Sequence, residues 1–256
     1  MRLKSVFVLL LSFASASWSL PIAPHWFGTE QLEVPQGCGY ELYRTREIHA
    51  TSANDGGHAN YYLLKGPSAD LLIDTGFGLQ SLHHHLRQLG LIGLQKLVVL
   101  ATHEHFDHAG GLRDFEGAAA IVMGDADADA VQCGNLIRTA AVEVRSYALT
   151  PWRYWDAAPE ANFSKALLSY KVQSHVDRRV SFQVLELPGH TPGSVGLFNA
   201  NGTKEIYTGD ALYDEELFDS CPDSDKSAYR VTMEFLRSLA GMNPCPKRDT
   251  TQSIFL

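Results

Sequence analysis

The sequence predicts a layered α/β fold, in which helices cover a core of β-strands. Strand-like segments alternate with stretches of helical periodicity along the 256 residues, a pattern typical of this class. The composition agrees, because 45% of the residues are hydrophobic and 20% are charged, as in globular proteins. The net charge of −8 argues against a nucleic-acid partner, since such binding depends on cations that neutralise phosphates.

Residues 1–19 are predicted to be a secretory signal peptide. Two basic residues precede a short apolar run, and Ala14-Ser15-Ala16 supplies small side chains for cleavage. The run is too short to cross a bilayer comfortably, so an uncleaved anchor is the less favoured alternative and we expect no stable membrane span. We therefore expect a secreted or lumenal glycoprotein, with glycosylation sequons at Asn162 and Asn201.

The mature domain is expected to cover residues 20–242 and to begin with a pair of strands. Residues 60–64 and 70–73 have strand patterns and are joined by a Gly-Pro-Ser turn. Leucines then recur at helical spacing up to Gly90, so this stretch is predicted to be a helix. Residues 97–101 form a continuous apolar run, as expected for a strand that is buried on both faces.

Three more elements are predicted in the second half of the chain. Residues 181–187 and 205–208 have strand patterns, and residues 225–240 carry apolar side chains on one helical face. Residues 243–256 begin with a polar run that lacks a strand pattern, so we expect an irregular C-terminal tail.

The most informative motif follows the apolar strand and reads Thr-His-Glu-His-Phe-Asp-His-Ala-Gly-Gly. His103 and His105 are one residue apart in extended chain, so both side chains point to one side and can bind one metal ion. Asp107 and His108 follow after a turn and can face a second ion. Imidazole and carboxylate ligands suit Zn²⁺, with iron or manganese as alternatives. The triplet at residues 83–85 is instead expected to lie on a solvated helix face.

Two other segments place chemically active residues after predicted strands. His190 lies in a turn rich in Gly and Pro, and Asp210 follows the strand at 205–208. In this order, and together with the Leu-Ile-Asp-Thr-Gly segment that contains Asp74, the motifs resemble the metallo-β-lactamase superfamily over residues 59–239. The resemblance implies an αββα sandwich with a metal site along one edge.

The resemblance also implies roles for individual residues. The first zinc ion would be held by His103, His105 and His190, and the second by Asp107, His108 and a bridging Asp210. Asp74 matches a position that supports the histidine loop without binding metal. His58 lies in a loop that borders the active-site mouth in the family, where substrate contact and a plain surface position are equally open.

Within the superfamily the chain resembles most the animal acyl-CoA thioesterase type, over residues 59–79 and 210–214. This implies a zinc hydrolase in which a metal-bound hydroxide attacks an acyl bond, most of all a thioester, of a small-molecule substrate. Asp107 would be catalytic, because its carboxylate can orient the nucleophile and help to move protons. The alternatives are a β-lactam or lactone hydrolase, and a secreted, partly degenerate metal-binding protein with little activity.

One feature departs from the family pattern. Members normally supply another histidine to the second metal after the bridging aspartate, whereas no histidine follows His190 in this sequence. The sandwich is therefore expected to lack its last strand and final histidine loop. We expect a weakened second site, one or two zinc ions per chain and reduced activity. The sequence leaves the oligomeric state open.

Overall fold

The computed structural model describes residues 26–48, 58–139, 163–165, 182–199, 205–213, 217–240 and 253–255. The predicted signal peptide, the sequon asparagines Asn162 and Asn201 and most of the predicted tail lie outside these ranges, as does the side chain of His58. Among the described residues, every helix is too short or too polar to cross a bilayer.

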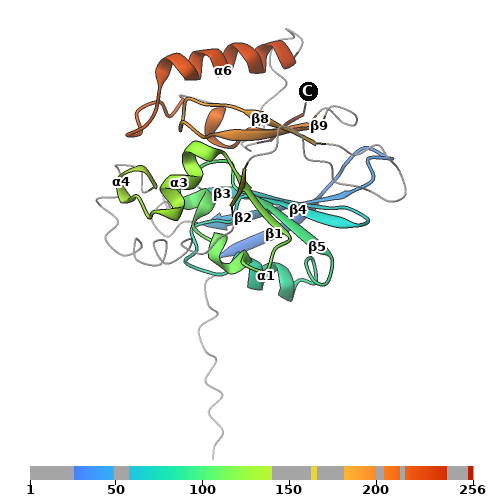
Figure 1. The fold of residues 1–256 in the computed structure, drawn as a ribbon. Helices are drawn as coiled ribbons and strands as arrows, with labels where there is room; N and C mark the ends of the chain where they lie inside the picture. Colours follow the sequence, from blue (N-terminus) through green and yellow to red (C-terminus); the bar gives the residue numbers. More distant parts are fainter. Residues whose placement is uncertain are drawn as a thin grey trace, which may run out of the picture.

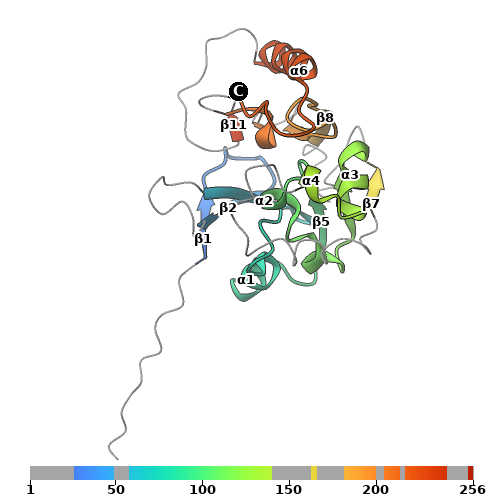
Figure 2. The same cartoon turned by 90° about the vertical axis from the view of Figure 1, so that its left-hand side faces the viewer.

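Two β-sheets pack face to face in the middle of the molecule (Figure 1, Figure 2). The first sheet has seven strands in the order β1-β2-β3-β4-β5-β6-β7, antiparallel from β1 to β4 and parallel from β4 to β7. Its strands are β1 (Phe27–Leu32), β2 (Glu41–Ile48), β3 (His58–Lys65), β4 (Ala69–Ile73), β5 (Lys96–Leu100), β6 (Ala120–Met123) and β7 (Phe163–Lys165). The second, antiparallel sheet has the order β11-β10-β9-β8 and consists of β8 (Phe182–Glu186), β9 (Val195–Asn199), β10 (Glu205–Tyr207) and β11 (Ser253–Phe255).

Helices cover the outer faces of both sheets. On the first sheet lie α1 (Leu82–Gln88), η1 (Leu112–Phe115) and α3 (Asp125–Gln132), whose apolar side chains share one core cluster with this sheet. On the second sheet lies α6 (Lys226–Leu239), drawn in red at the top of Figure 1. The short elements α2 (Phe106–Ala109), α4 (Leu136–Thr139) and η3 (Gly209–Ala211) lie in the loops. The predicted αββα sandwich is therefore confirmed.

Strands β4 and β5 show why the central strands consist of apolar runs. In β5, Val98 and Leu100 point into the core between the two sheets, whereas Val99 points into the core beneath the helices. Leu72 of β4 alternates with its neighbours in the same way. Both faces of these strands are thus removed from water, which confirms the prediction for residues 97–101.

The last helix, α6, confirms the amphipathic pattern seen at residues 225–240. Tyr229, Thr232 and Leu236 are buried on its inner face. Asp225 caps the helix, because its Oδ1 accepts hydrogen bonds from the backbone N–H groups of Ser227 (2.7 Å) and Ala228 (3.0 Å).

Two local predictions differ from the structure. Ser253–Phe255, within the predicted irregular tail, form the edge strand β11 on β10, where the sequence led us to expect no further strand. A strand of only three residues forms because the edge of the neighbouring strand offers hydrogen-bonding groups. The sequence of such a short segment therefore gives little indication that it is a strand. In the histidine triplet only His84 is exposed: His83 packs on the ring of Phe115, and His85 Nε2 lies 2.8 Å from the Thr29 hydroxyl.

Candidate metal centre

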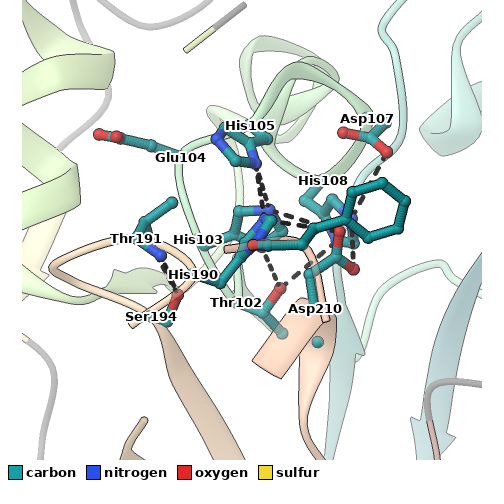
Figure 3. A network of polar contacts seen from close by, with 12 residues as sticks. Thr102, His103, Glu104, His105, Asp107, His108, His190, Thr191, Ser194 and Asp210 are labelled. Atoms are coloured by element: carbon teal, nitrogen blue, oxygen red, sulfur yellow. Dashed lines mark hydrogen bonds and ion pairs between the residues drawn. The ribbon is translucent and has the colours of Figure 1, made fainter. Parts of the chain in front are cut away.

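The ligand-type side chains gather at one edge of the sandwich, because each follows the end of a strand (Figure 3). Asp74 follows β4, the histidine motif follows β5, His190 follows β8 and Asp210 follows β10. The two sheets are joined at this edge by a hydrogen bond of 2.8 Å from Val195 N–H to the carbonyl of Thr102. Residues that are far apart in sequence are thereby brought together.

Three histidines form the first donor group. His105 Nδ1 lies 3.0 Å from His103 Nε2 and 2.9 Å from His190 Nε2. The three rings stand nearly perpendicular to one another, with interplanar angles of 80–89°. All three side chains are buried. Three nitrogen atoms that converge from perpendicular rings suit a metal ion that keeps a further position open.

The hydrogen bonds around these rings leave the converging nitrogens available as ligands. His190 Nδ1 lies 2.7 Å from the carbonyl oxygen of Phe218, which can only accept, so Nδ1 donates this hydrogen bond and Nε2 is the nitrogen that faces His105. Burial, together with neighbouring histidines, lowers the pKa of His103 and lowers that of His105 to about 3. Both rings are therefore neutral at physiological pH, the form that binds metal.

A second donor group consists of His103, His108 and Asp210. His108 Nε2 lies 3.2 Å from Asp210 Oδ1, and Asp210 Oδ2 lies 3.6 Å from His190 Nε2, so Asp210 also lies close to the first group. Asp107 lies at the border, with Oδ2 3.6 Å from His108 Nε2 and its side chain 26% exposed. The sequence-based assignment grouped Asp107 with His108 and Asp210, whereas the compact group contains His103 in its place.

The His108 ring tests whether these residues fit a metal ion. Its Nε2 is buried without a hydrogen-bond partner, although carboxylate oxygens lie close to it. Burial alone would lower the pKa of His108, but Asp210, Asp74 and Asp107 outweigh it and raise the pKa well above its usual value. A buried nitrogen without a hydrogen-bond partner, placed among several carboxylates, is the environment that a divalent cation would complete. The residues therefore fit a metal centre.

Asp74 supports His108 from the other side of the ring. Its Oδ2 lies 2.8 Å from His108 Nδ1, the nitrogen that faces away from Asp210. The same carboxylate accepts hydrogen bonds from the backbone N–H (2.7 Å) and the hydroxyl (3.0 Å) of Thr102. Asp74 has a φ of +64°, an uncommon conformation for a residue other than glycine. It is absent from both donor groups.

The sequence analysis did not identify Glu47, which forms a hydrogen bond to the loop after β4, behind the metal centre. Its Oε2 accepts hydrogen bonds from the Tyr61 hydroxyl (2.6 Å) and from the backbone N–H of Phe77 (3.1 Å). Phe77 in turn packs on Phe106 at the start of α2. A single acidic residue in a strand carries no sequence signal for such a role.

Glu47 also makes the stability of the protein depend on pH. Burial raises the pKa of Glu47 from 4.5 to about 7, against the opposing effect of its hydrogen bonds. The folded protein therefore keeps the Glu47 proton to a higher pH than the unfolded chain does. The free energy of unfolding is not reduced by Glu47 below pH 4.5, and it falls as the pH rises through 7. We expect Glu47→Gln to remove this loss, which amounts to about 3 kcal/mol.

The measurement is denaturant unfolding of the metal-free protein at several pH values between 4.5 and 8. The matched control is Glu33→Gln, which neutralises an exposed carboxylate. Parallel stability profiles for wild type and Glu47→Gln would contradict the titration of Glu47 in this range.

A model of the metallo-beta-lactamase superfamily matches residues 54–244 of the chain. Acyl-coenzyme A thioesterase MBLAC2 from Gallus gallus is 35% identical over 234 residues, which cover 85% of this chain and 77% of that protein. The Homo sapiens protein of the same name is 33% identical over 198 residues, which cover 72% of this chain and 69% of that protein.

Solved structures agree on the fold. The dizinc quorum-quenching lactonase AidC superposes with a TM-score of 0.56 at 21% identity, covering 85% of this chain and 88% of that one. A metallo-beta-lactamase from Pontibacter korlensis has a TM-score of 0.55 at 15% identity, covering 82% and 86%. At such identities the similarity concerns the fold alone.

Proposed function

Because the chain belongs to the metallo-β-lactamase superfamily, we propose that it is a zinc-dependent hydrolase that cleaves an acyl bond, with thioesters as its preferred substrates. The observation that carries this proposal is the convergence of His103, His105 and His190 on one point, next to the unsatisfied Nε2 of His108. Similarity to proteins named acyl-coenzyme A thioesterases supports the choice of substrate class.

In the proposed centre, two neighbouring positions would hold one ion each. His103, His105 and His190 would bind the first zinc ion, and Asp107 and His108 the second, with Asp210 between them. Zinc bound there would supply Lewis acidity and lower the pKa of a bound water to near neutrality. Because the first position has three buried imidazoles, whereas Asp107 of the second position is partly exposed at the border of the centre, we propose that the second position binds its ion more weakly than the first.

The protein's own residues would orient the reactants. Asp107 is the partly exposed carboxylate at the border of the centre, where it can accept a proton from the attacking water and orient it. Asp74 and Thr102 keep the His108 ring in place. A serine nucleophile is not needed, and Ser194 is engaged in its turn, where its Oγ accepts a hydrogen bond from Thr191 N–H.

A second candidate function follows from the predicted signal peptide. A secreted enzyme would meet little acyl-CoA, so the proposed secretory location favours a lactone or a β-lactam as the substrate. A third candidate is a metal-binding protein with little activity. All three readings share the same metal centre and differ in the turnover that they predict.

The test is hydrolysis by the purified chain with and without metal. We expect thiol release from a medium-chain acyl-CoA, loss of this activity after chelation, and recovery when zinc is restored. A chromogenic β-lactam and an acyl-homoserine lactone are assayed in parallel, and bound zinc per chain is measured by mass spectrometry. Thioester hydrolysis that survives complete metal removal would contradict the mechanism, and faster lactone or β-lactam turnover would replace the substrate class. Zinc binding without turnover would favour the metal-binding protein.

A further inference from the structure

Asp127, on helix α3, is a buried carboxylate outside both donor groups. Its side chain is 0% exposed, and its helix packs on the first sheet. The sequence shows it only as one of several acidic residues in an Asp-Ala-Asp-Ala-Asp run, where a solvated helix face would be the ordinary expectation. A buried carboxylate is costly unless it is well hydrogen-bonded, so its partners should explain its presence.

The partners of Asp127 come from the two loops that carry the first group of histidines. Oδ2 accepts a hydrogen bond of 3.1 Å from the backbone N–H of Glu104, the residue between His103 and His105. Oδ2 also accepts one of 2.6 Å from the hydroxyl of Thr191, the residue after His190. Figure 3 shows Glu104 and Thr191 on the same side of the histidine cluster.

A third hydrogen bond satisfies the other oxygen atom of the Asp127 carboxylate. Oδ1 accepts from the backbone N–H of Gly193 at 2.6 Å, so the His190 loop is held at two points. This close approach requires glycine: a Cβ at Gly193 would lie 2.6 Å from Oδ1, and one at Gly124 would lie 2.0 Å from the carbonyl oxygen of Gly193. The contact between α3 and the His190 loop therefore depends on the Asp127 carboxylate.

One cation balances part of the charge. Arg138 Nη2 lies 3.6 Å from Asp127 Oδ1 and 2.9 Å from Glu104 Oε2. The guanidinium therefore belongs to the same network, which joins the helical layer to both loops. Because Arg138 lies farther from Asp127 than the three N–H and O–H donors do, it neutralises charge rather than setting the position of the loops.

We propose that Asp127 is a positioning residue that sets the separation of His190 from His103 and His105, and so determines how tightly the first zinc ion is bound. The inference rests on the metal centre of the proposed function. His105 and His190 are 85 residues apart in sequence, so their spacing depends on contacts between loops rather than on local geometry. A carboxylate that bonds both loops restricts this spacing directly.

The test compares Asp127→Asn with Asp129→Asn, which changes an exposed aspartate on the same helix. An asparagine keeps the size of the side chain but turns one acceptor into a donor, so at least one of the three hydrogen bonds must be lost. Zinc affinity is measured by competition with a chromophoric chelator, and ligand geometry by the visible absorption of the Co²⁺-substituted protein. Circular dichroism of the metal-free proteins establishes that they are folded.

We expect Asp127→Asn to weaken zinc binding about 10- to 100-fold and to alter the Co²⁺ spectrum, while Asp129→Asn behaves as wild type. If Asp127→Asn does not fold, Thr191→Val and Thr191→Ser take its place: valine should weaken zinc binding and serine should restore it. Wild-type affinity and an unchanged spectrum in folded Asp127→Asn, or in Thr191→Val, would overturn the positioning role and leave the proposed function intact. A wild-type protein that binds no zinc would overturn both.

Discussion

Replacing His103 with alanine is expected to remove bound metal and to reduce hydrolysis at least about a thousandfold. The reason is that His103 belongs to both donor groups. Its Nε2 lies 3.0 Å from His105 Nδ1 and 3.9 Å from Asp210 Oδ2, so the alanine variant loses a ligand-type nitrogen next to each position. Two-ligand remnants bind zinc much more weakly than the three-ligand set of a catalytic site.

The measurement combines zinc content per chain with initial rates of thiol release from acyl-CoA. His84→Ala is the matched control, because it removes an exposed imidazole from α1 and leaves the centre untouched. Circular dichroism establishes that both variants are folded. A His103→Ala protein that keeps its zinc and its rate would show that the histidine cluster is not the functional centre.

Replacing Asp74 with alanine is expected to lower the free energy of unfolding of the metal-free protein by about 3–5 kcal/mol. The substitution leaves three buried donors without their acceptor: the N–H and hydroxyl of Thr102 and Nδ1 of His108. Alanine is also disfavoured at the φ of +64° that Asp74 adopts, which adds to the loss. The freed His108 ring can then rotate, so zinc binding at the second position should weaken as well.

Denaturant unfolding of the metal-free proteins measures this effect without a contribution from bound ligand. Asp74→Asn separates the effect of backbone strain from the effect of the lost acceptor. Asparagine tolerates a positive φ, but only one of its two terminal side-chain atoms can accept a hydrogen bond. We expect it to be intermediate between wild type and Asp74→Ala. Asp114→Ala, at an exposed position in η1, is the control. A loss below about 1 kcal/mol in Asp74→Ala would mean that these donors find other partners.

The local chemistry of the centre could be predicted from short sequence patterns. An apolar run followed by His103, His105, Asp107 and His108 indicates a buried strand that ends in ligand-type residues, and the structure has β5 there. The expected positions after strands hold for His190 and Asp210 too. Such predictions succeed because the period of side chains along a strand, and the turn residues after it, are properties of a few neighbouring residues.

Other features depended on partners that no local pattern specifies. The side chains of Glu47 and Asp127 look like ordinary surface acids in the sequence, yet both are buried and hydrogen-bonded to backbone groups of remote loops. The same holds for β11, whose three residues form a strand only because the edge of β10 offers hydrogen-bonding groups. Burial of a polar group is decided by what packs around it, and that is a long-range property.

The sequence by itself determined which residue types carry the chemistry and at which strand ends they lie. Only the tertiary structure decided that His190 and Asp210 reach the histidines of the β5 loop, through the contact of the two sheets at Thr102 and Val195. The physical reason is that periodicity is encoded over a few residues, whereas the distance between two loops follows from the packing of whole sheets and from carboxylates that bond across them.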